Sequence, residues 1–314
     1  MKIENIIKSK RPIKILIGGS PCTYWSIAQN PDKREITNNG MGWELFVNYV
    51  IAKDKFKPDF FLYENNESIS KIIQNEIEKS LGVRLLHINS AIVSAQTRHR
   101  IYATNIKVTN TLESKNIKVK DIIDYDYHNE NIISEVVFNN VDETKNTDKM
   151  IRIGTIGKGG QGERVYSING KSCTLSANGG GRGAKTGLYL VNNEVRKLTP
   201  LEAERLQTLP DNYTLCDGVS ETQRYKCIGN GWTVNVINYI LSHIDIPKDY
   251  PIEVLSMYDG IATGMYCLKQ LGYTNITYKS YEIDKYAIKI AVKHHPEIIQ
   301  CGDAFQIRND DWQY

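Results

Sequence analysis

The sequence predicts an α/β fold built on an open sheet, the kind that binds ligands beyond the carboxyl ends of its strands. Two stretches indicate this fold. Residues 13–17 are mostly apolar and β-branched, and Gly18, Gly19 and Pro21 follow them, which is typical of a buried strand that ends in a sharp turn. Residues 254–264 also predict a strand, here followed by a glycine-containing turn and a helix.

Composition excludes several classes of protein. The 314 residues can form one large domain and a smaller one, and 41% apolar with 24% charged residues is ordinary globular composition. The net charge of +3 is too small to indicate nucleic-acid binding by itself. The six cysteines have no CxxC pair, and no apolar run is long enough for a signal peptide or membrane helix. We therefore expect a cytoplasmic protein with no membrane partner.

The first third of the chain alternates between element types. Residues 30–42 are polar and contain glycine, which predicts a mobile loop, and 43–53 have the apolar spacing of a helix that covers the sheet. Residues 59–63 predict a strand with Glu64-Asn65-Asn66 at its carboxyl end. The following elements should be a helix over 68–80 and strands near 83–89 and 100–105.

Charge changes sharply in the middle of the chain. Residues 121–148 contain eight acidic residues and one lysine, whereas 149–185 contain seven Lys/Arg and only Glu163. The second window is also rich in glycine, and we interpret 151–190 as a separate, loop-dominated module that faces nucleic acid. A flexible linker is the alternative, but its tyrosines and leucines, Tyr166 and Leu175 among them, are packing material that linkers seldom carry.

The last third returns to alternating helices and strands. Residues 196–209 predict a helix with Thr199 as N-cap, Pro200 first and Glu202 third, and a second helix should follow Gly231. The remaining elements should be a connector over 242–253, the strand–turn–helix unit from 254, a strand ending at 281–284, and a helix near 286–294.

The turn after the strand at 254 has the features of a cofactor site. Asp259 and two glycines stand where backbone N–H groups can hold a ligand at a helix N-terminus. Glu282, some 20 residues on, has the placement of a carboxylate that binds ribose hydroxyls. This pattern fits NAD as well as S-adenosylmethionine. The GxGxxG fingerprint is absent, so a pyrophosphate has no evident cradle and a dehydrogenase is disfavoured.

Six stretches of the chain resemble motifs of the C5-cytosine DNA methyltransferases. They are Gly18-Gly19-Ser20-Pro21-Cys22, Glu64-Asn65, Gln96-Thr97-Arg98-His99-Arg100, Arg196 to Pro210, Gly229 to Val234, and Asp259 to Gly264. The resemblance implies an S-adenosylmethionine-dependent methyltransferase fold, Rossmann-like with a mostly parallel seven-stranded sheet, plus a small loop- and β-rich target-recognition domain.

The motifs occur in a rotated order, because the nucleophile half leads and the cofactor half ends the chain. Read cyclically the family order is intact, with the break between Asp303 and Ile13. This implies a circular permutation, with neighbouring termini and a complete sheet in one chain; two artificially joined half-genes are the alternative. The expected domains are the nucleophile half (1–120), the recognition domain (121–200), the hinge and last-motif helices (201–253), and the cofactor half (254–314).

The resemblance also implies a mechanism and its residues. Cys22 would add to C6 of a flipped-out cytosine and so activate C5, which is too weak a nucleophile alone. Glu64 would contact N3 and the exocyclic amine, and Arg98 and Arg100 would orient the base and a phosphate and stabilise the thiolate. The expected activity is that of a DNA (cytosine-5-)-methyltransferase, in restriction–modification or in a phage.

The implied cofactor is S-adenosylmethionine, and no metal is expected. Its expected contacts are Tyr258, Asp259, Gly260, Ala262, Thr263, Gly264, Glu282, Ile283, Asp303, Leu45, Asn230 and Trp232. His294-His295 has no matching ligands nearby, and we interpret this pair as the surface of a helix end rather than a metal site.

The module at 151–190 resembles the recognition loops of GCGC-specific bacterial enzymes. By that resemblance Gln161 would fill the space left by the flipped cytosine and Arg164 would read a guanine. Lys158, Arg182 and Lys185 would contact phosphate. Asn178, Arg182 and Gly183 depart from the expected pattern, which puts a GCGC target in doubt.

The expected partner is double-stranded DNA, together with a cognate endonuclease if the protein belongs to a restriction–modification pair, and the expected state is a monomer. Two other functions stay open. A DNA-binding protein that has lost catalysis is disfavoured by the intact Cys22, Glu64, Arg98 and Arg100. An RNA cytosine-5 methyltransferase is disfavoured by the recognition-loop resemblance.

Overall fold

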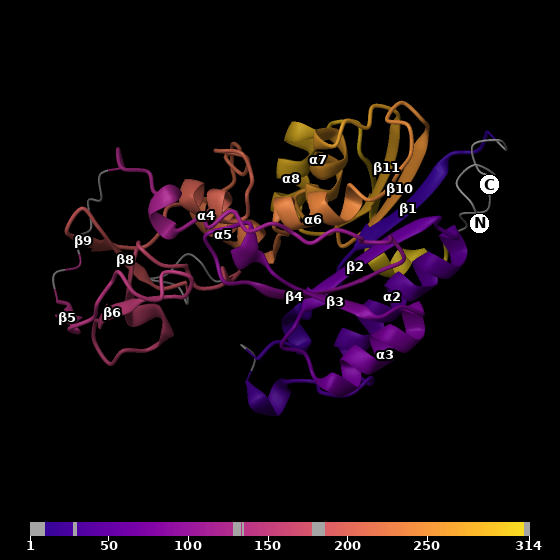
Figure 1. Cartoon of the computed structure of the whole chain (residues 1–314). Helices are drawn as coiled ribbons and strands as arrows, with labels where there is room; N and C mark the ends of the chain where they lie inside the picture. The colour runs from indigo at the N-terminus through magenta and orange to yellow at the C-terminus, as the bar shows by residue number, and fades with distance from the viewer. Residues whose placement is uncertain (1–9, 28–29, 128–132, 134, 178–185, 311–314) are drawn as a thin grey trace. The chain divides into compact units, whose positions relative to one another are not determined.

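The computed structural model describes residues 10–27, 30–127, 133, 135–177 and 186–310. The chain divides into two compact units, which are described separately below (Figure 1). Unit 1 contains residues 1–88, 99–110 and 237–314, and unit 2 contains residues 89–98 and 111–236. Within the described ranges, no helix is long and apolar enough to cross a membrane.

Unit 1 is organised on a mixed sheet of seven strands, in the order β12-β11-β10-β1-β2-β4-β3. The neighbours from β12 to β2 are parallel, and β4 is antiparallel to β2. The strands are β1 Ile13–Gly18, β2 Phe60–Asn66, β3 Leu85–Asn89, β4 His99–Thr104, β10 Ile252–Met257, β11 Ile276–Tyr281 and β12 Ile299–Gly302. The predicted seven-stranded, mostly parallel sheet is therefore confirmed, and all its strands come from one chain.

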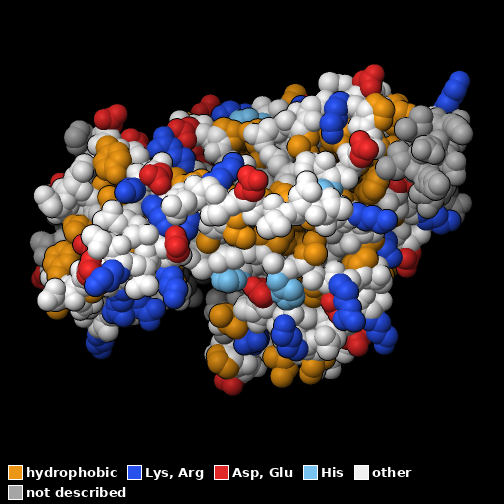
Figure 2. Space-filling model, in the orientation of Figure 1, with side chains coloured by type: hydrophobic (Ala, Val, Ile, Leu, Met, Phe, Trp, Pro, Cys, Tyr) orange, Lys and Arg blue, Asp and Glu red, His pale blue; other side chains and the backbone are white. Residues whose placement is uncertain are grey.

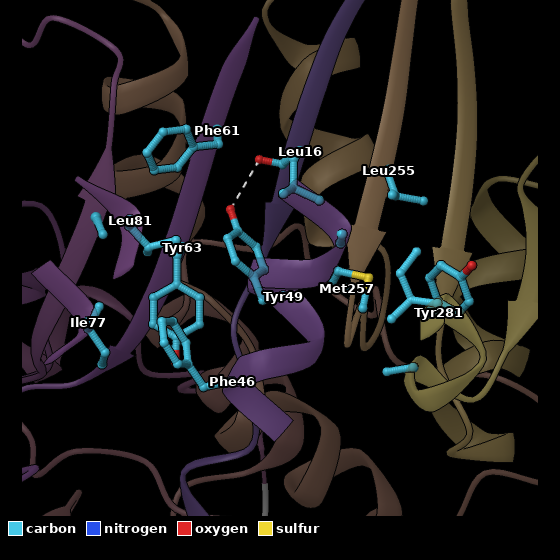
Figure 3. Close-up of a cluster of buried hydrophobic side chains, with 14 of the residues drawn as sticks. Leu16, Phe46, Tyr49, Phe61, Tyr63, Ile77, Leu81, Leu255, Met257 and Tyr281 are labelled. Carbon is cyan, nitrogen blue, oxygen red and sulfur yellow. Dashed lines mark hydrogen bonds between the residues drawn. The ribbon is translucent and has the colours of Figure 1, made fainter. Parts of the chain in front are cut away.

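Helices α2 (Met41–Phe56), α3 (Lys71–Leu81), α7 (Thr263–Gln270) and α8 (Lys285–His294) belong to unit 1. The prediction that 43–53 covers the sheet is confirmed, because α2 buries Phe46, Tyr49 and Phe56 in the core. Figure 3 shows Phe46 and Tyr49 directed at the ring of Tyr63 on β2, with ring centroids 5.2 and 5.0 Å away. The Tyr49 hydroxyl also donates to the carbonyl of Leu16 on β1. Aromatic packing thus fixes the two strands that lead to the site.

Unit 2 contains a five-stranded sheet in the order β5-β6-β7-β8-β9. Its strands are β5 Val137–Phe138, β6 Arg152–Thr155, β7 Arg164–Ser167, β8 Leu188–Val191 and β9 Glu194–Arg196. Apolar side chains from β6 to β9, such as Ile153, Val165 and Leu188, form a core of their own. The window 151–190 contains β6, β7 and the first residues of β8, and most of its other described residues lie in turns and loops, as predicted. Helices α4 (Pro200–Leu206) and α5 (Glu221–Asn230) follow.

Several predicted boundaries are wrong, and each has a physical reason. Strand β2 continues through Asn66 because β4 pairs with its last residues, so Glu64 lies inside the strand. Arg196 ends β9, and the helix begins only at Pro200, although Thr199 is its N-cap as predicted. The polar loop at 30–42 contains a 3-10 turn at Pro31–Lys33 and the start of α2.

Other elements match the prediction or were missed by it. Helix α6 (Val234–Leu241) follows Gly231 as predicted, whereas α5 was not predicted. His295 is buried rather than on the surface, because it caps the end of α8 against Lys269. The predicted closeness of the termini concerns residues 1–9 and 311–314, which lie outside the described residues.

Candidate active site

The turn that leads from β1 to Cys22 packs against β2 at Gly19. A Cβ added to Gly19 would lie 2.6 Å from the carbonyl oxygen of Glu64 and 3.1 Å from its Oε2, so only glycine permits this approach. Cys22 begins a single 3-10 turn, Cys22–Tyr24, and its carbonyl accepts the N–H groups of Trp25 and Ser26. The turn is partly exposed at Cys22 while Trp25 is buried behind it.

Buried hydrogen bonds join this turn to the strand that carries Glu64. Ser20 Oγ lies 2.7 Å from the hydroxyl of Tyr63. Asn65 Nδ2 donates to that hydroxyl at 2.8 Å and to the carbonyl of Ser20 at 3.1 Å. Burial raises the pKa of Tyr63 well above its usual value, so the network keeps its hydroxyl proton. The turn and the strand are therefore held as one rigid support.

Glu64 is paired with Arg100 across two antiparallel strands. The Nε of Arg100 lies 2.9 Å from Oε1 of Glu64, and both side chains are almost fully buried. The same guanidinium donates to Asn66 Oδ1 at 2.9 Å and to the carbonyl of His99 at 2.8 Å. Three acceptors fix the arginine, and the arginine fixes the carboxylate.

Arg98 lies in unit 2, although it is only two residues from Arg100. Its buried guanidinium donates to the carbonyls of Leu175, Gly229 and Gly231, at 3.2, 3.1 and 2.8 Å. Neighbouring Gln96 donates to the carbonyl of Leu206 at 2.7 Å and to Gln207. These bonds hold together three distant segments of unit 2, while the expected contact of Arg98 with the base stays a prediction.

Asp259 anchors the turn after β10. It accepts hydrogen bonds from the hydroxyls of Ser256 and Tyr278 at 2.6 Å and of Ser280 at 3.1 Å. Burial raises the pKa of Asp259 to about 6, even though these hydrogen bonds favour the ionised form. The carboxylate thereby joins the turn to β10, through Ser256, and to β11, through Tyr278 and Ser280.

Glu282 holds the other side of the same turn. Its Oε2 accepts the N–H of Gly260 at 2.7 Å, and its Oε1 accepts those of Ile283 and Asp284 at 2.8 Å. Gly260 has φ +61°, and nothing lies within 4 Å of a Cβ added there, so the turn is open on that side. Ile283 is 70% exposed beside it, which is unusual for an isoleucine next to a buried strand.

The other predicted cofactor residues are divided between the units. Ala262, in the left-handed region at φ +58°, caps α7, which then begins with Thr263 and Gly264. A Cβ on Gly264 would lie 2.2 Å from Ile17, so the helix packs directly on β1. The Tyr258 hydroxyl donates to the carbonyl of Leu45, and Asp303 caps the 3-10 turn Ala304–Arg308. Asn230 and Trp232 lie in unit 2, at the end of α5 and just after it.

Three of the residues predicted to contact DNA, Lys158, Gln161 and Arg164, lie on the loop between β6 and β7 or at its end. Gln161 begins the 3-10 turn Gln161–Glu163, Lys158 is exposed, and Arg164 begins β7. Glu163 closes this loop by accepting the N–H of Gly160 at 2.8 Å. Figure 2 shows Lys and Arg side chains gathered on this part of unit 2, around and below the position of β6. Arg182 and Lys185, with Asn178 and Gly183, lie outside the described residues.

Comparison with known proteins identifies the family. Residues 1–245 match the family described as C-5 cytosine-specific DNA methylase. The chain belongs to this family. The type II methyltransferase M.HhaI of Haemophilus parahaemolyticus is 34% identical over 254 residues, which cover 73% of this chain and 75% of the relative. The type II methyltransferase M.SsoII of Shigella sonnei is 30% identical over 253 residues, covering 74% of this chain and 63% of the relative.

A solved structure supports the fold alone. The Entamoeba histolytica methyltransferase EhMeth matches with a TM-score of 0.51 at 18% identity, over 77% of this chain and 79% of that one. The predicted enzyme class, a DNA cytosine-5 methyltransferase, is confirmed by the family and by its named relatives.

The family uses S-adenosylmethionine as methyl donor, and the turn after β10 is suited to it. The space beside Gly260 is open, because nothing lies within 4 Å of a Cβ added there. The carboxylate of Glu282 is of the type that accepts from hydroxyl groups, and the exposed side chain of Ile283 is an apolar group of the type that packs against a base. The residues present therefore fit the adenosine part of this cofactor.

Sequence reasoning missed the residues that support this methyltransferase site. Tyr63 and Ser20 join the turn to the strand, and Gln207 donates to the carbonyls of Ile228 and Gly231 in unit 2. Ser20 and Gln207 stand inside recognised motifs, so their positions were noticed but their roles were not. Tyr63 follows three apolar residues and precedes Glu64, which was the only signal.

Proposed function

We propose that this methyltransferase methylates C5 of a cytosine flipped out of double-stranded DNA, through a transient bond between Cys22 Sγ and C6. The observation that carries this proposal is the close approach of Gly19, three residues before Cys22, to the backbone and carboxylate of Glu64, which is paired with Arg100. A nucleophile and a group that can neutralise charge on the base are thereby supported by one hydrogen-bonded network.

The chemistry assigns each residue a task. As the thiolate of Cys22 forms a bond to C6, an electron pair moves toward N3, and a proton held between N3 and Glu64 neutralises it. C5 then has enamine character and takes the methyl group, which S-adenosylmethionine supplies when bound. The C5 proton then passes to solvent, the electrons of the C5–H bond form the C5=C6 bond as the Cys22 thiolate leaves C6, and the proton on N3 returns to Glu64. Arg100 keeps Glu64 oriented throughout.

Cofactor binding is assigned to the turn after β10. Glu282 and Asp303 would bind the ribose and adenine, and Tyr258, Leu45 and Ile283 would line the base. The backbone from Asp259 to Gly264 would surround the methionine part. Asn230 and Trp232 would close the pocket, as the family resemblance implies.

We also propose that the chain is a circular permutant of its family. Numbered from β10, the strand order becomes 3-2-1-4-5-7-6, whose first five positions follow the usual doubly wound order. The family match ends at residue 245, before the segment that forms β10 to β12. Both observations support a break in the original chain between Asp303 and Ile13.

Target recognition is assigned to the sheet of unit 2 and the loop between β6 and β7, within residues 121–200. Gln161 and Arg164 would read the site, and Lys158, Arg182 and Lys185 would contact phosphates. The proposed target is GCGC-like, and the proposed role is in restriction–modification, with a cognate endonuclease, or in a phage. The protein is proposed to be a monomer in the cytoplasm. The type II methyltransferases among its relatives support the restriction–modification setting.

Bisulfite sequencing of plasmid from a host free of cytosine methylation, expressing this protein, tests the function. Protected cytosines in one fixed context would establish the base, the position and the target site together. Soluble protein with no protected cytosine would contradict the proposal and favour a silent DNA-binding protein or an RNA methyltransferase. Incubation with host RNA and labelled S-adenosylmethionine would then separate those two.

A further inference from the structure

Tyr258 has a strained backbone at the cofactor turn. Its φ is +59°, a region that large aromatic residues seldom occupy because Cβ crowds the backbone. Its half-buried side chain extends to α2, where the hydroxyl donates to the carbonyl of Leu45 at 2.8 Å. A strained backbone conformation persists only when surrounding contacts hold it. The hydrogen bonds of the Tyr258 hydroxyl are such contacts.

Asn48 supplies the second contact. It lies one turn after Leu45 on α2 and is fully buried. Its Nδ2 donates to the Tyr258 hydroxyl at 3.3 Å, and its Oδ1 accepts from Nε of Arg308 at 2.7 Å. Both ends of the buried amide are therefore used.

Arg308 comes from the 3-10 turn Ala304–Arg308, which begins at Asp303. The Nη2 of Arg308 forms an ion pair with Oε2 of Glu44 at 2.7 Å. The same turn has an independent attachment to α2, because Lys55 Nζ donates to the carbonyls of Ile307, Arg308 and Asp310 at 3.0, 2.8 and 2.8 Å. Two basic contacts thus hold this turn, but only Arg308 continues to Tyr258.

We infer that Arg308 and Asn48 are positioning residues that orient Tyr258 against Leu45 and so set the affinity of the pocket for the adenosine part of S-adenosylmethionine. This inference rests on the proposed cofactor assignment of Tyr258, Leu45 and Asp303. The relay links all three, since Arg308 follows Asp303 in the same turn and Asn48 follows Leu45 on the same helix.

The direction of the hydrogen bonds explains how the relay works. The guanidinium of Arg308 can only donate, so the amide of Asn48 must present its oxygen to it and its NH₂ to Tyr258. The Tyr258 oxygen then accepts, and its own proton is left for the carbonyl of Leu45. Without Arg308 the amide can turn over, and the tyrosine proton can be drawn away from Leu45.

Calorimetric titration of the whole protein with S-adenosylmethionine and with S-adenosylhomocysteine tests the relay. We expect Arg308→Gln to weaken both ligands about tenfold, because both carry the adenosine part. The kcat at saturating cofactor and the KM for DNA should stay unchanged. Lys55→Met is the matched control, because it removes backbone contacts of the same turn but no side-chain hydrogen bond of the relay, and it should bind both ligands like the wild type.

Asn48→Leu should weaken binding at least as much as Arg308→Gln. Because both changes interrupt one relay, the double variant should bind no more weakly than the Asn48→Leu single variant. Wild-type affinity in Arg308→Gln, or an equal loss in Lys55→Met, would overturn the relay while leaving the cofactor assignment intact. No binding of either ligand by the wild type would overturn the cofactor assignment and the relay with it. Melting temperatures of all variants identify any that fail to fold.

Discussion

Arg100 and Glu64 form a diagonal pair on one face of the sheet. Arg100 stands opposite Asn66, and Glu64 is two residues earlier on β2, so alternate side chains bring the guanidinium and the carboxylate to 2.9 Å. Arg100 thereby contacts both Asn66 and Glu64. The pair is the part of the site on which most of the proposed chemistry depends.

Replacing Arg100 should reduce catalysis more than DNA binding. In Arg100→Gln the charge and the fixed fork are lost, and Glu64 is left almost fully buried without its partner. We expect kcat to fall about 100-fold, since general acid–base groups contribute on that scale. Steady-state methyl transfer measures it, and Arg84→Gln, which removes a guanidinium that is 92% exposed, is the control. An unchanged kcat would remove Arg100 from the mechanism.

Cys22→Ser should abolish methylation and retain DNA binding. The hydroxyl is nearly the size of the thiol but is a far weaker nucleophile toward C6 near neutral pH. Electrophoretic mobility shift with target DNA, beside methyl-transfer assays, checks both parts. Cys216→Ser provides a partly exposed cysteine outside the proposed site as control. Methylation at the wild-type rate in Cys22→Ser would contradict the proposed nucleophile.

Gly19→Ala should damage both stability and activity. The new Cβ would lie 2.6 Å from the Glu64 carbonyl oxygen, which is backbone and cannot move without distorting β2. We expect a loss of about 1–3 kcal/mol in the free energy of unfolding, typical of overpacking. Denaturant titration measures it. Ser20→Ala removes a hydrogen bond to Tyr63 without adding volume, and should cost about 1 kcal/mol. An alanine variant as stable and active as wild type would show that the turn has room to adjust.

The buried pair of Arg196 and Glu202 should be a strong determinant of stability in unit 2. The two are joined by bonds of 2.8 and 2.7 Å, and Glu202 is fully buried. Arg196→Met would leave that buried carboxylate with its backbone N–H partners but without its cation, at a cost of about 3–5 kcal/mol. Lys145→Met breaks an exposed pair with Asp142 and should cost less than about 1 kcal/mol. Urea unfolding measures the free energy of unfolding of both variants. An equal loss in the two would contradict a special contribution of the buried Arg196–Glu202 pair.

The buried His295 should make the protein less stable as the pH is lowered. Burial lowers its pKa from 6.5 to about 4, so the unfolded state binds more protons between these values. The free energy of unfolding therefore decreases as pH falls through this window, by about 3 kcal/mol at most. Asp259, whose pKa is raised from 3.8 to about 6, acts in the opposite sense. The comparison of His295→Leu with wild type isolates the histidine, and parallel pH profiles would refute its role.

Most elements of the fold were predictable because their causes are local. The apolar run of β1, the spacing of α2 and the Thr199–Pro200–Glu202 N-terminus of α4 are visible in short windows. Boundaries failed where a distant strand decided them. Glu64 was placed after β2 because polar residues usually end strands, but pairing with Tyr102 extends the ladder past it.

The sequence by itself determined the family, the order of the motifs and the residue types available for chemistry. Only the tertiary structure decided which of those residues meet. Arg98 and Arg100 stand two residues apart in one motif, yet one holds carbonyls in unit 2 and the other holds Glu64 in unit 1. The contact between Asn48 and Arg308 spans 260 residues. Such partners depend on register and strand order, which arise from packing over the whole sheet and leave no local pattern in the sequence.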